Sequence, residues 1–208
     1  MPLYLIFFTS FLIGFSGAIS PGPLLAVTIE ETIKRDFKAG PLIIIGHSLL
    51  ELLMVLLLIF GFGNFLKKEM IQLYLSIFGG SFLIYTGFLS FFSSQKIKIE
   101  QNINISYKSN YSLIFEGIFV SLSNPYWTIW WITIGLVYLS FAFPYGFKGI
   151  FLFFTGHIFS DFLWYSFVSY FIFKSKKLIS EKYLKYISSF FSVFLILFGG
   201  FLIIRKLI

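Results

Sequence analysis

Long apolar runs alternate with short polar segments along the whole chain. Each run is about 20 residues or longer, which is the length that an α-helix needs to cross the hydrocarbon layer of a bilayer. The pattern therefore predicts an all-α integral membrane protein with six transmembrane helices, at residues 3–29, 41–62, 71–92, 112–143, 149–173 and 183–204.

The longest polar segment, residues 93–111, is rich in Asn, Ser and Lys and contains no apolar run of spanning length. Its composition is typical of a linker between structural units. We therefore expect two three-helix units, at residues 1–92 and 112–208, joined by this polar segment.

Three short motifs recur in both units and in the same order. Gly14 and Ser20 match Gly117 and Ser123, each 103 residues later. The sequences "GHSLLE" and "FGGSFLI" in the first unit match "GHIFSD" and "FGGFLII" in the second. Three ordered matches indicate an internal duplication. Because each unit crosses the bilayer three times, the second must enter from the opposite side, which predicts two inverted three-helix repeats.

Composition supports a membrane location, since 58% of the residues are hydrophobic and 12% are charged. So few charges cannot cover a water-soluble globule of this size. The net charge of +7 does not indicate nucleic acid as a partner, because the Lys and Arg residues lie in the gaps between apolar runs. The absence of cysteine excludes a dithiol relay.

The distribution of basic residues predicts the orientation in the membrane. Eleven of the sixteen Lys and Arg residues follow the first, third and fifth predicted helices. Cytoplasmic loops carry the excess of basic residues in membrane proteins. Both termini are therefore expected outside the cytoplasm, and the linker at 93–111 inside it.

Prolines interrupt the first and fourth predicted helices. The first contains "SPGP" at residues 20–23, and the fourth contains "SNP" at residues 123–125. Proline lacks a backbone donor and clashes with the preceding turn, so we expect both helices to be discontinuous. Freed backbone groups persist in a membrane where protein or a wet cavity satisfies them, and symmetric breaks are typical of transport sites. A packing kink is the alternative interpretation of each break.

Two pairs of ionisable residues lie within predicted helices. His47 and Glu51 are four residues apart and share one helix face, and His157 and Asp161 repeat this arrangement. The two carboxyl groups fall near the middle of their helices, where a charge is costly unless it faces a partner or a cavity. Histidine changes charge near neutral pH, so these pairs are candidates for carrying protons. Pairs that only tie helices together are the alternative.

The segments around the breaks resemble the lysine-exporter (LysE) family of amino-acid exporters. The resemblance rests on "SPGP" near the end of the first apolar run, the charged segment, Gly40 and Gly46 that follow it, and "SNP" in the second half. It implies an inner-membrane transporter that exports amino acids or related small metabolites by proton antiport. No enzymatic activity, cofactor or resident metal is expected on this interpretation.

The breaks and the ionisable pairs together define the expected site. The substrate would bind at Ser20, Pro21, Gly22, Pro23, Ser123, Asn124, Pro125 and Trp127. Proton coupling would depend on His47, Glu51, His157 and Asp161. The other expected partners are protons and the lipid bilayer, and a homo-oligomer is compatible with the sequence.

A different cargo is the main alternative, because two imidazoles and two carboxylates also suit Zn, Ni or Mn. The protein would then be a divalent metal cation efflux carrier using the same paired residues. A membrane enzyme is disfavoured, because neither H-E-x-x-H nor G-x-S-x-G occurs in the chain.

Two further groups of residues carry weaker expectations. The charged residues after the first break are expected to form a solvated cytoplasmic segment with local ion pairs: Glu30, Glu31, Lys34, Arg35, Asp36 and Lys38. The tryptophans after the second break are interpreted as packing or interfacial aromatics, with a cation–π wall as the alternative: Trp127, Trp130 and Trp131.

Overall fold

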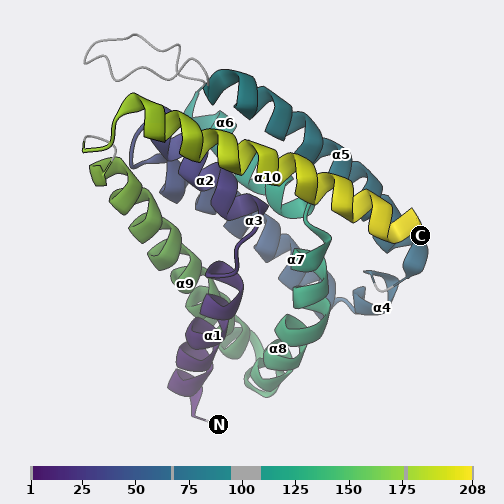
Figure 1. Cartoon of the computed structure of the whole chain (residues 1–208). Helices are drawn as coiled ribbons and strands as arrows, with labels where there is room; N and C mark the ends of the chain where they lie inside the picture. The colour runs from purple at the N-terminus through teal and green to yellow at the C-terminus, as the bar shows by residue number, and fades with distance from the viewer. Residues whose placement is uncertain (1, 67, 95–108, 176–177, 208) are drawn as a thin grey trace.

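The computed structural model describes residues 2–66, 68–94, 109–175 and 178–207, and these residues form helices without a strand (Figure 1). The helices are α1 (Leu3–Ala18), α2 (Pro23–Lys34), α3 (Ala39–Ile59), α4 (Gly63–Leu66), α5 (Glu69–Ser94), α6 (Asn110–Leu122), α7 (Pro125–Trp130), the π-helix η1 (Trp131–Gly135), α8 (Leu136–Ala142), the 3₁₀-helix η2 (Phe143–Tyr145), α9 (Gly146–Ser175) and α10 (Glu181–Leu207). Most of the predicted linker, residues 95–108, lies outside the described residues.

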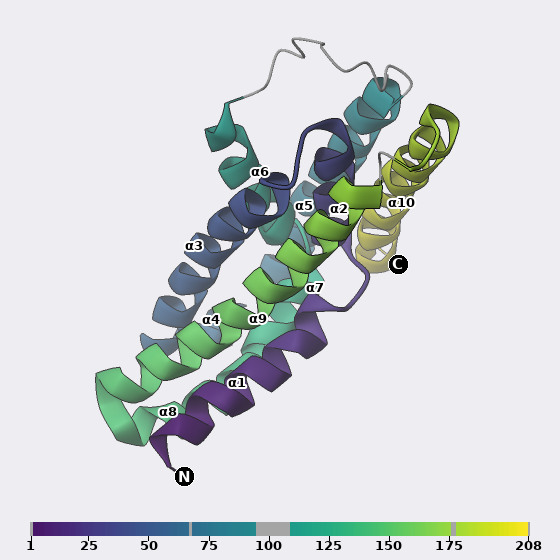
Figure 2. The same cartoon turned by 90° about the vertical axis from the view of Figure 1, so that its left-hand side faces the viewer.

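Four helical runs in the described part of the chain are long and apolar enough to cross a membrane. They are Ala39–Ile59, Glu69–Phe92, Pro125–Ser175 and Glu181–Leu207, and α1 with α2 makes a fifth if this bent pair counts as one span. The 51-residue run Pro125–Ser175 reverses at Gly146, whose φ is 56°, so that α8 and α9 pack against each other (Figure 2). The chain is therefore a multi-pass helical membrane protein.

Both predicted helix breaks are present. Helices α1 and α2 meet at an angle of 76° across the break. Pro23 is the first residue of α2 and Pro125 the first of α7, where the missing N–H has no intrahelical acceptor to lose. Asn124 caps α7 by accepting a hydrogen bond from the Tyr126 amide (3.1 Å). Each proline therefore starts a new helix instead of kinking an old one.

Three pairs of helices pack closely through glycine: α1 with α9, α3 with α6, and α5 with α10. A Cβ at Gly46 would lie 1.8 Å from the Ile114 carbonyl oxygen. At the α5–α10 crossing, a Cβ at Gly80 or at Gly199 would lie 2.6 or 2.5 Å from the other glycine's carbonyl oxygen. Small residues at such crossings let helix backbones approach in a membrane, where packing has to replace the hydrophobic effect.

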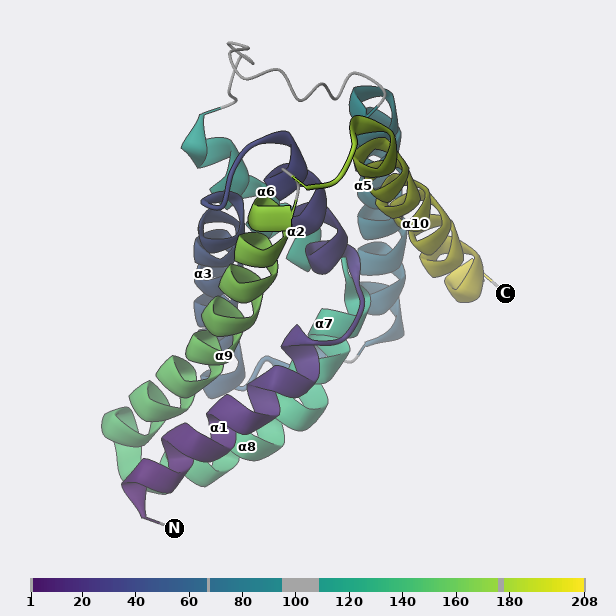
Figure 3. The same cartoon turned by 60° about the vertical axis from the view of Figure 1, so that its left-hand side comes forward.

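Helix α2 lies inside the bundle, in contact with α3, α6, α9 and α10 (Figure 3). Nine of its twelve residues are buried, and Glu30 is 1% exposed. The expectation of a solvated charged segment is therefore wrong for Glu30 and Glu31, although the local ion pairs are present. The predicted end of the first span, residue 29, is also too early, because the helix continues to Lys34 and its Glu30–Lys34 contact supports the last turn.

Candidate functional site

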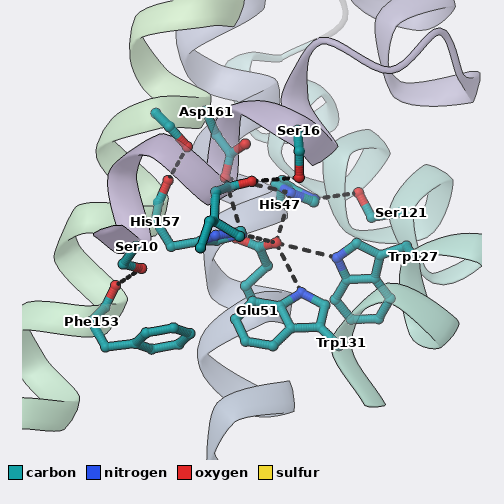
Figure 4. Close-up of polar contacts among 12 residues, drawn as sticks. Ser10, Ser16, His47, Glu51, Ser121, Trp127, Trp131, Phe153, His157 and Asp161 are labelled. Carbon is teal, nitrogen blue, oxygen red and sulfur yellow. Dashed lines mark hydrogen bonds and ion pairs between the residues drawn. The ribbon is translucent and has the colours of Figure 1, made fainter. Parts of the chain in front are cut away.

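The four ionisable residues singled out in the sequence meet at one point in the protein interior (Figure 4). Glu51 Oε1 lies 3.1 Å from His47 Nε2 and 3.2 Å from His157 Nε2. Asp161 Oδ2 lies 3.7 Å from His157 Nε2 and 4.0 Å from His47 Nε2. Each histidine therefore faces carboxyl groups from both halves of the chain, and all four side chains are buried.

Glycines next to these residues bring the neighbouring helices close. Gly156 directly precedes His157, and a Cβ there would lie 2.4 Å from the Phe7 carbonyl oxygen on α1. A Cβ at Gly14 would lie 2.1 Å from Ser160 Oγ and 3.0 Å from His157 Nδ1. Helix α1 therefore lies directly against the inward face of α9.

Two tryptophans complete the surroundings of Glu51. Trp127 and Trp131 donate their indole N–H groups to Glu51 Oε1, at 3.3 and 3.1 Å. Trp131 is fully buried and starts the π-helical turn η1. The expectation that Trp131 is a packing or interfacial aromatic therefore missed its polar role, although its four-residue spacing from Trp127 placed both on one helix face.

Ser121 is a second residue that the sequence did not single out. Its hydroxyl lies 2.7 Å from His47 Nδ1 and also 2.7 Å from the Gly117 carbonyl oxygen, to which it donates. A hydroxyl has one proton, so Ser121 accepts a hydrogen bond from His47 Nδ1–H. Nε2 of this tautomer carries no proton unless the ring is charged, and the contact with Glu51 Oε1 needs a proton on one of the two atoms.

Two buried oxygens of the cluster have no hydrogen-bond partner in the described structure: Glu51 Oε2 and Asp161 Oδ2. Glu51 therefore has two unlike oxygens, because four nitrogen atoms surround Oε1 while Oε2 has no donor. Buried acceptors are almost always hydrogen-bonded in native proteins, so these two oxygens need a partner from water, an ion or a ligand.

A cavity of about 350 Å³ joins this cluster to both helix breaks. The predicted residues in its wall are Ser20, Pro21, Gly22, Asn124, Trp127, His47, Glu51, His157 and Asp161. The other wall residues are Gly14, Gly17, Ala18, Leu24, Val120, Ser121, Tyr126, Trp130, Tyr165 and Phe198. The cavity has the volume of a small-molecule site and contains no Lys or Arg side chain in its wall.

Three of the predicted substrate-binding residues are not in the wall. Pro23, Ser123 and Pro125 are buried and do not line the cavity. The Ser123 hydroxyl donates to the Phe119 carbonyl (2.5 Å), and the Ser20 hydroxyl in the same way donates to Ser16 (2.7 Å). Both hydroxyl groups therefore donate their protons to backbone carbonyl oxygens four residues earlier in the chain.

Three residues of the cluster also present possible ligand atoms for a metal ion. One ligand atom each from His47, Glu51 and Asp161 lies within 4.8 Å of the others. Glu51 Oε1 accepts two indole N–H groups, which point their positive ends at this oxygen. A cation at this cluster would therefore need Glu51 Oε2, which has no hydrogen-bond partner among the described residues.

Comparison with known proteins gives two matches. The family model described as "LysE type translocator" matches residues 15–206. The chain is 25% identical over 197 residues to the Bacillus subtilis (strain 168) protein named "Putative amino acid efflux protein YcgF", with 93% of each chain covered. No solved structure gives a significant match.

Proposed function

Because the chain belongs to the LysE type translocator family, we propose that it exports amino acids or related small metabolites across the cell's inner membrane by proton antiport. The relative in Bacillus subtilis is named for amino acid efflux. The observation that carries the proposal is a cavity whose wall combines both helix breaks with both histidine–carboxyl pairs.

The proposed architecture is six spans in two inverted repeats, with both termini outside the cytoplasm. The spans are α1 with α2, α3, α5, α6 through α8, α9 and α10. In the proposed repeats α1 corresponds to α6, α3 to α9 and α5 to α10. Exchanging the repeats therefore turns the contact of α1 with α9 into the contact of α6 with α3, and it leaves the contact of α5 with α10 unchanged. The α5–α10 crossing lies at the repeated "FGG" motif, where Gly80 of the first copy meets Gly199 of the second.

The broken first helix supplies opposite partial charges to one cavity. Helix α1 ends at Ala18 and α2 begins after Gly22, and both residues are in the cavity wall. No side chain caps the α2 N-terminus, so its first amides are free to bind a carboxylate. The carbonyls at the end of α1 carry partial negative charge. An amino acid presents one group of each kind.

The buried cluster provides the proposed proton site. The contact between His47 Nε2 and Glu51 Oε1 holds a proton on either atom, because Ser121 fixes the other ring nitrogen as a donor. His157 gives Glu51 and Asp161 a second partner from the other repeat. Exchange follows if the substrate and the protons favour opposite-facing states of the two repeats.

The test uses purified protein in proton-tight liposomes that contain a pH-sensitive dye. A panel of amino acids should move protons, whereas a panel of divalent metals should not. Glu51→Gln and Asp161→Asn should each abolish proton movement, while Glu69→Gln, which changes an exposed carboxyl group at the start of α5, should not. Full coupling in both site variants would overturn the proton assignment, and movement with metals alone would make the protein a metal carrier.

A further inference from the structure

The unpaired oxygens of the cluster match the donors of one ligand group. A primary ammonium group has three N–H donors and no acceptor, so it needs several acceptors that lack a partner. Glu51 Oε2 and Asp161 Oδ2 have no hydrogen-bond partner among the described residues, although Asp161 Oδ2 lies 3.7 and 4.0 Å from the two imidazole Nε2 atoms. Their carboxyl groups come from different helices. Both residues line the cavity that contains the end of α1, whose carbonyls favour a positive group.

The rest of the cavity wall limits the side chain of the ligand. Glu51 and Asp161 are the acidic residues of the wall, so an ammonium group that binds both would leave no counter-charge for a second positive charge. A negative side chain would lie in a wall without Lys or Arg. Apolar contact is available from Leu24, Val120, Tyr126 and Phe198, which come from four different helices.

From this arrangement we propose that Glu51 and Asp161 hold the α-ammonium group of an exported amino acid whose side chain is apolar. The proposal rests on the proposed exporter function and names the class of its substrate. It also means that the substrate and the transported proton use the same two carboxyl groups, so that binding of one displaces the other.

The test is counterflow of labelled L-leucine into liposomes that contain the purified protein. L-Leucinamide keeps the ammonium group, and 4-methylpentanoate keeps the side chain and carboxylate but lacks it. L-Leucinamide should compete with leucine at least about tenfold better than 4-methylpentanoate, since hydrogen bonds to charged groups are the strong ones. L-Lysine and L-glutamate should compete less well than L-isoleucine or L-phenylalanine.

The variant Asp161→Asn keeps the shape of the side chain and removes its charge. The apparent affinity for leucine and leucinamide should fall by about tenfold or more, while that for 4-methylpentanoate should not fall. Equal competition by 4-methylpentanoate, or preference for lysine or glutamate, would overturn this inference and leave the exporter function standing. Counterflow of no amino acid at all would instead overturn the proposed function.

A separate set of contacts concerns α2, which fills the interior beyond the cavity. Hydrogen bonds tie its C-terminal half to hydroxyl groups on four different helices. They join Thr32 to Ser169 on α9 (2.7 Å), Lys34 to Ser90 on α5 (2.9 Å), Glu30 to Ser192 on α10 (2.5 Å) and Arg35 to Ser112 on α6 (3.4 Å). The end of α2 is therefore hydrogen-bonded to four of the helices around it.

Charged residues of this segment pair with one another. Lys34 Nζ lies 3.8 Å from Glu30 Oε2 and 3.6 Å from Glu31 Oε1, and Arg35 Nε lies 2.7 Å from Glu31 Oε2. The four neighbouring helices contribute hydroxyl groups to the bonds above. If α2 moves out of the bundle, the charged residues that pair with one another move together. The hydroxyl groups left behind on the neighbouring helices are neutral, and water can form hydrogen bonds with them.

We infer that α2 is the gate between the cavity and the end of the molecule at which α2 and α9 end and α10 begins (Figure 2). The test is a reversible cross-link in a chain that has no cysteine of its own. Oxidised Thr32→Cys/Ser169→Cys should lose leucine counterflow, and dithiothreitol should restore it.

The matched control is Ser94→Cys/Ser189→Cys, whose hydroxyls lie 3.0 Å apart and which would join α5 to α10 without joining either helix to α2. Its counterflow should survive oxidation. Transport by the cross-linked Thr32–Ser169 protein would overturn the gate. Because counterflow is measured in the reduced protein first, loss of the exporter function itself would be visible separately.

Discussion

At the scale of single residues, the two oxygens of Glu51 differ in their hydrogen-bond partners. Oε1 is fixed by two indole N–H groups and two imidazoles, while Oε2 has no partner in the described structure. The indoles only donate, so they hold Oε1 as an acceptor and aim Oε2 elsewhere. The residue is therefore oriented before any ligand arrives.

Replacing Trp131 by Phe should lower thermal stability. The substitution keeps an aromatic ring but removes the 3.1 Å hydrogen bond to Glu51 Oε1. A hydrogen bond to a charged group contributes about 1.5–3 kcal/mol, so the melting temperature in detergent should fall by several degrees. Trp164→Phe is the control, because the buried Trp164 Nε1 has no partner among the described residues. A larger loss for Trp164→Phe would contradict this account of Trp131.

Replacing Ser121 by Ala should affect proton coupling more than substrate exchange. Without the hydroxyl, Nδ1 of His47 is no longer fixed as a donor, and the proton at the Glu51 contact is no longer defined. The number of protons moved per leucine exported should fall by a larger factor than leucine counterflow falls. Ser140→Ala, at an exposed serine bonded within its own helix, is the control. Equal loss of both activities would indicate a purely structural role.

The sequence predicts the His and carboxyl residues but not Ser121 or Trp131 as their partners. The former repeat at a fixed four-residue spacing, which is visible in the chain itself. The latter act across helices, over sequence separations of 74 and 80 residues. Such contacts depend on how the helices dock, and local periodicity carries no information about that.

At the scale of helices, glycine decides which pairs can dock. The α3–α6 crossing has Gly46 against Ile114 and Gly117 against Ile43, each with room for no Cβ. The same crossing places His47 beside Ser121.

The breaks follow from local proline chemistry and were predictable, whereas the burial of α2 was not. Six charges in the nine residues 30–38 indicate a solvated segment. Ion pairs within the segment and hydroxyl groups on four other helices make an interior position acceptable.

Replacing Gly46 by Ala should separate α3 from α6. The added Cβ would lie 1.8 Å from a backbone oxygen, which cannot move like a side chain. Overpacking of this kind costs about 1–3 kcal/mol, and both stability and counterflow should fall. Gly200→Ala is the matched control, since nothing lies within 4 Å of its added Cβ. Unchanged melting and counterflow in Gly46→Ala would contradict the close crossing.

At the scale of the whole molecule, the proposed inverted duplication rests on the order of the repeated motifs in the sequence. The α1–α9 and α3–α6 contacts are the pairs that exchanging the two proposed repeats would interconvert. The cavity contains residues from both repeats, so each repeat can move against the other around it. The proposed orientation rests on the excess of basic residues expected in cytoplasmic loops. An odd number of crossings per repeat would make the two proposed repeats face opposite ways.

Cysteine labelling measures that orientation directly, because the chain has no cysteine of its own. Leu178, between α9 and α10, is 89% exposed, and Phe147, at the start of α9, is 81% exposed. The 30-residue helix α9 lies between them and spans about 45 Å, enough for one crossing. In intact cells, a membrane-impermeant maleimide should label Phe147→Cys and should reach Leu178→Cys only after the cells are opened. The reverse result would invert the whole molecule and put both termini in the cytoplasm. Labelling of both from one side would remove α9 as a span, and with it the odd number of crossings on which the inverted repeat depends.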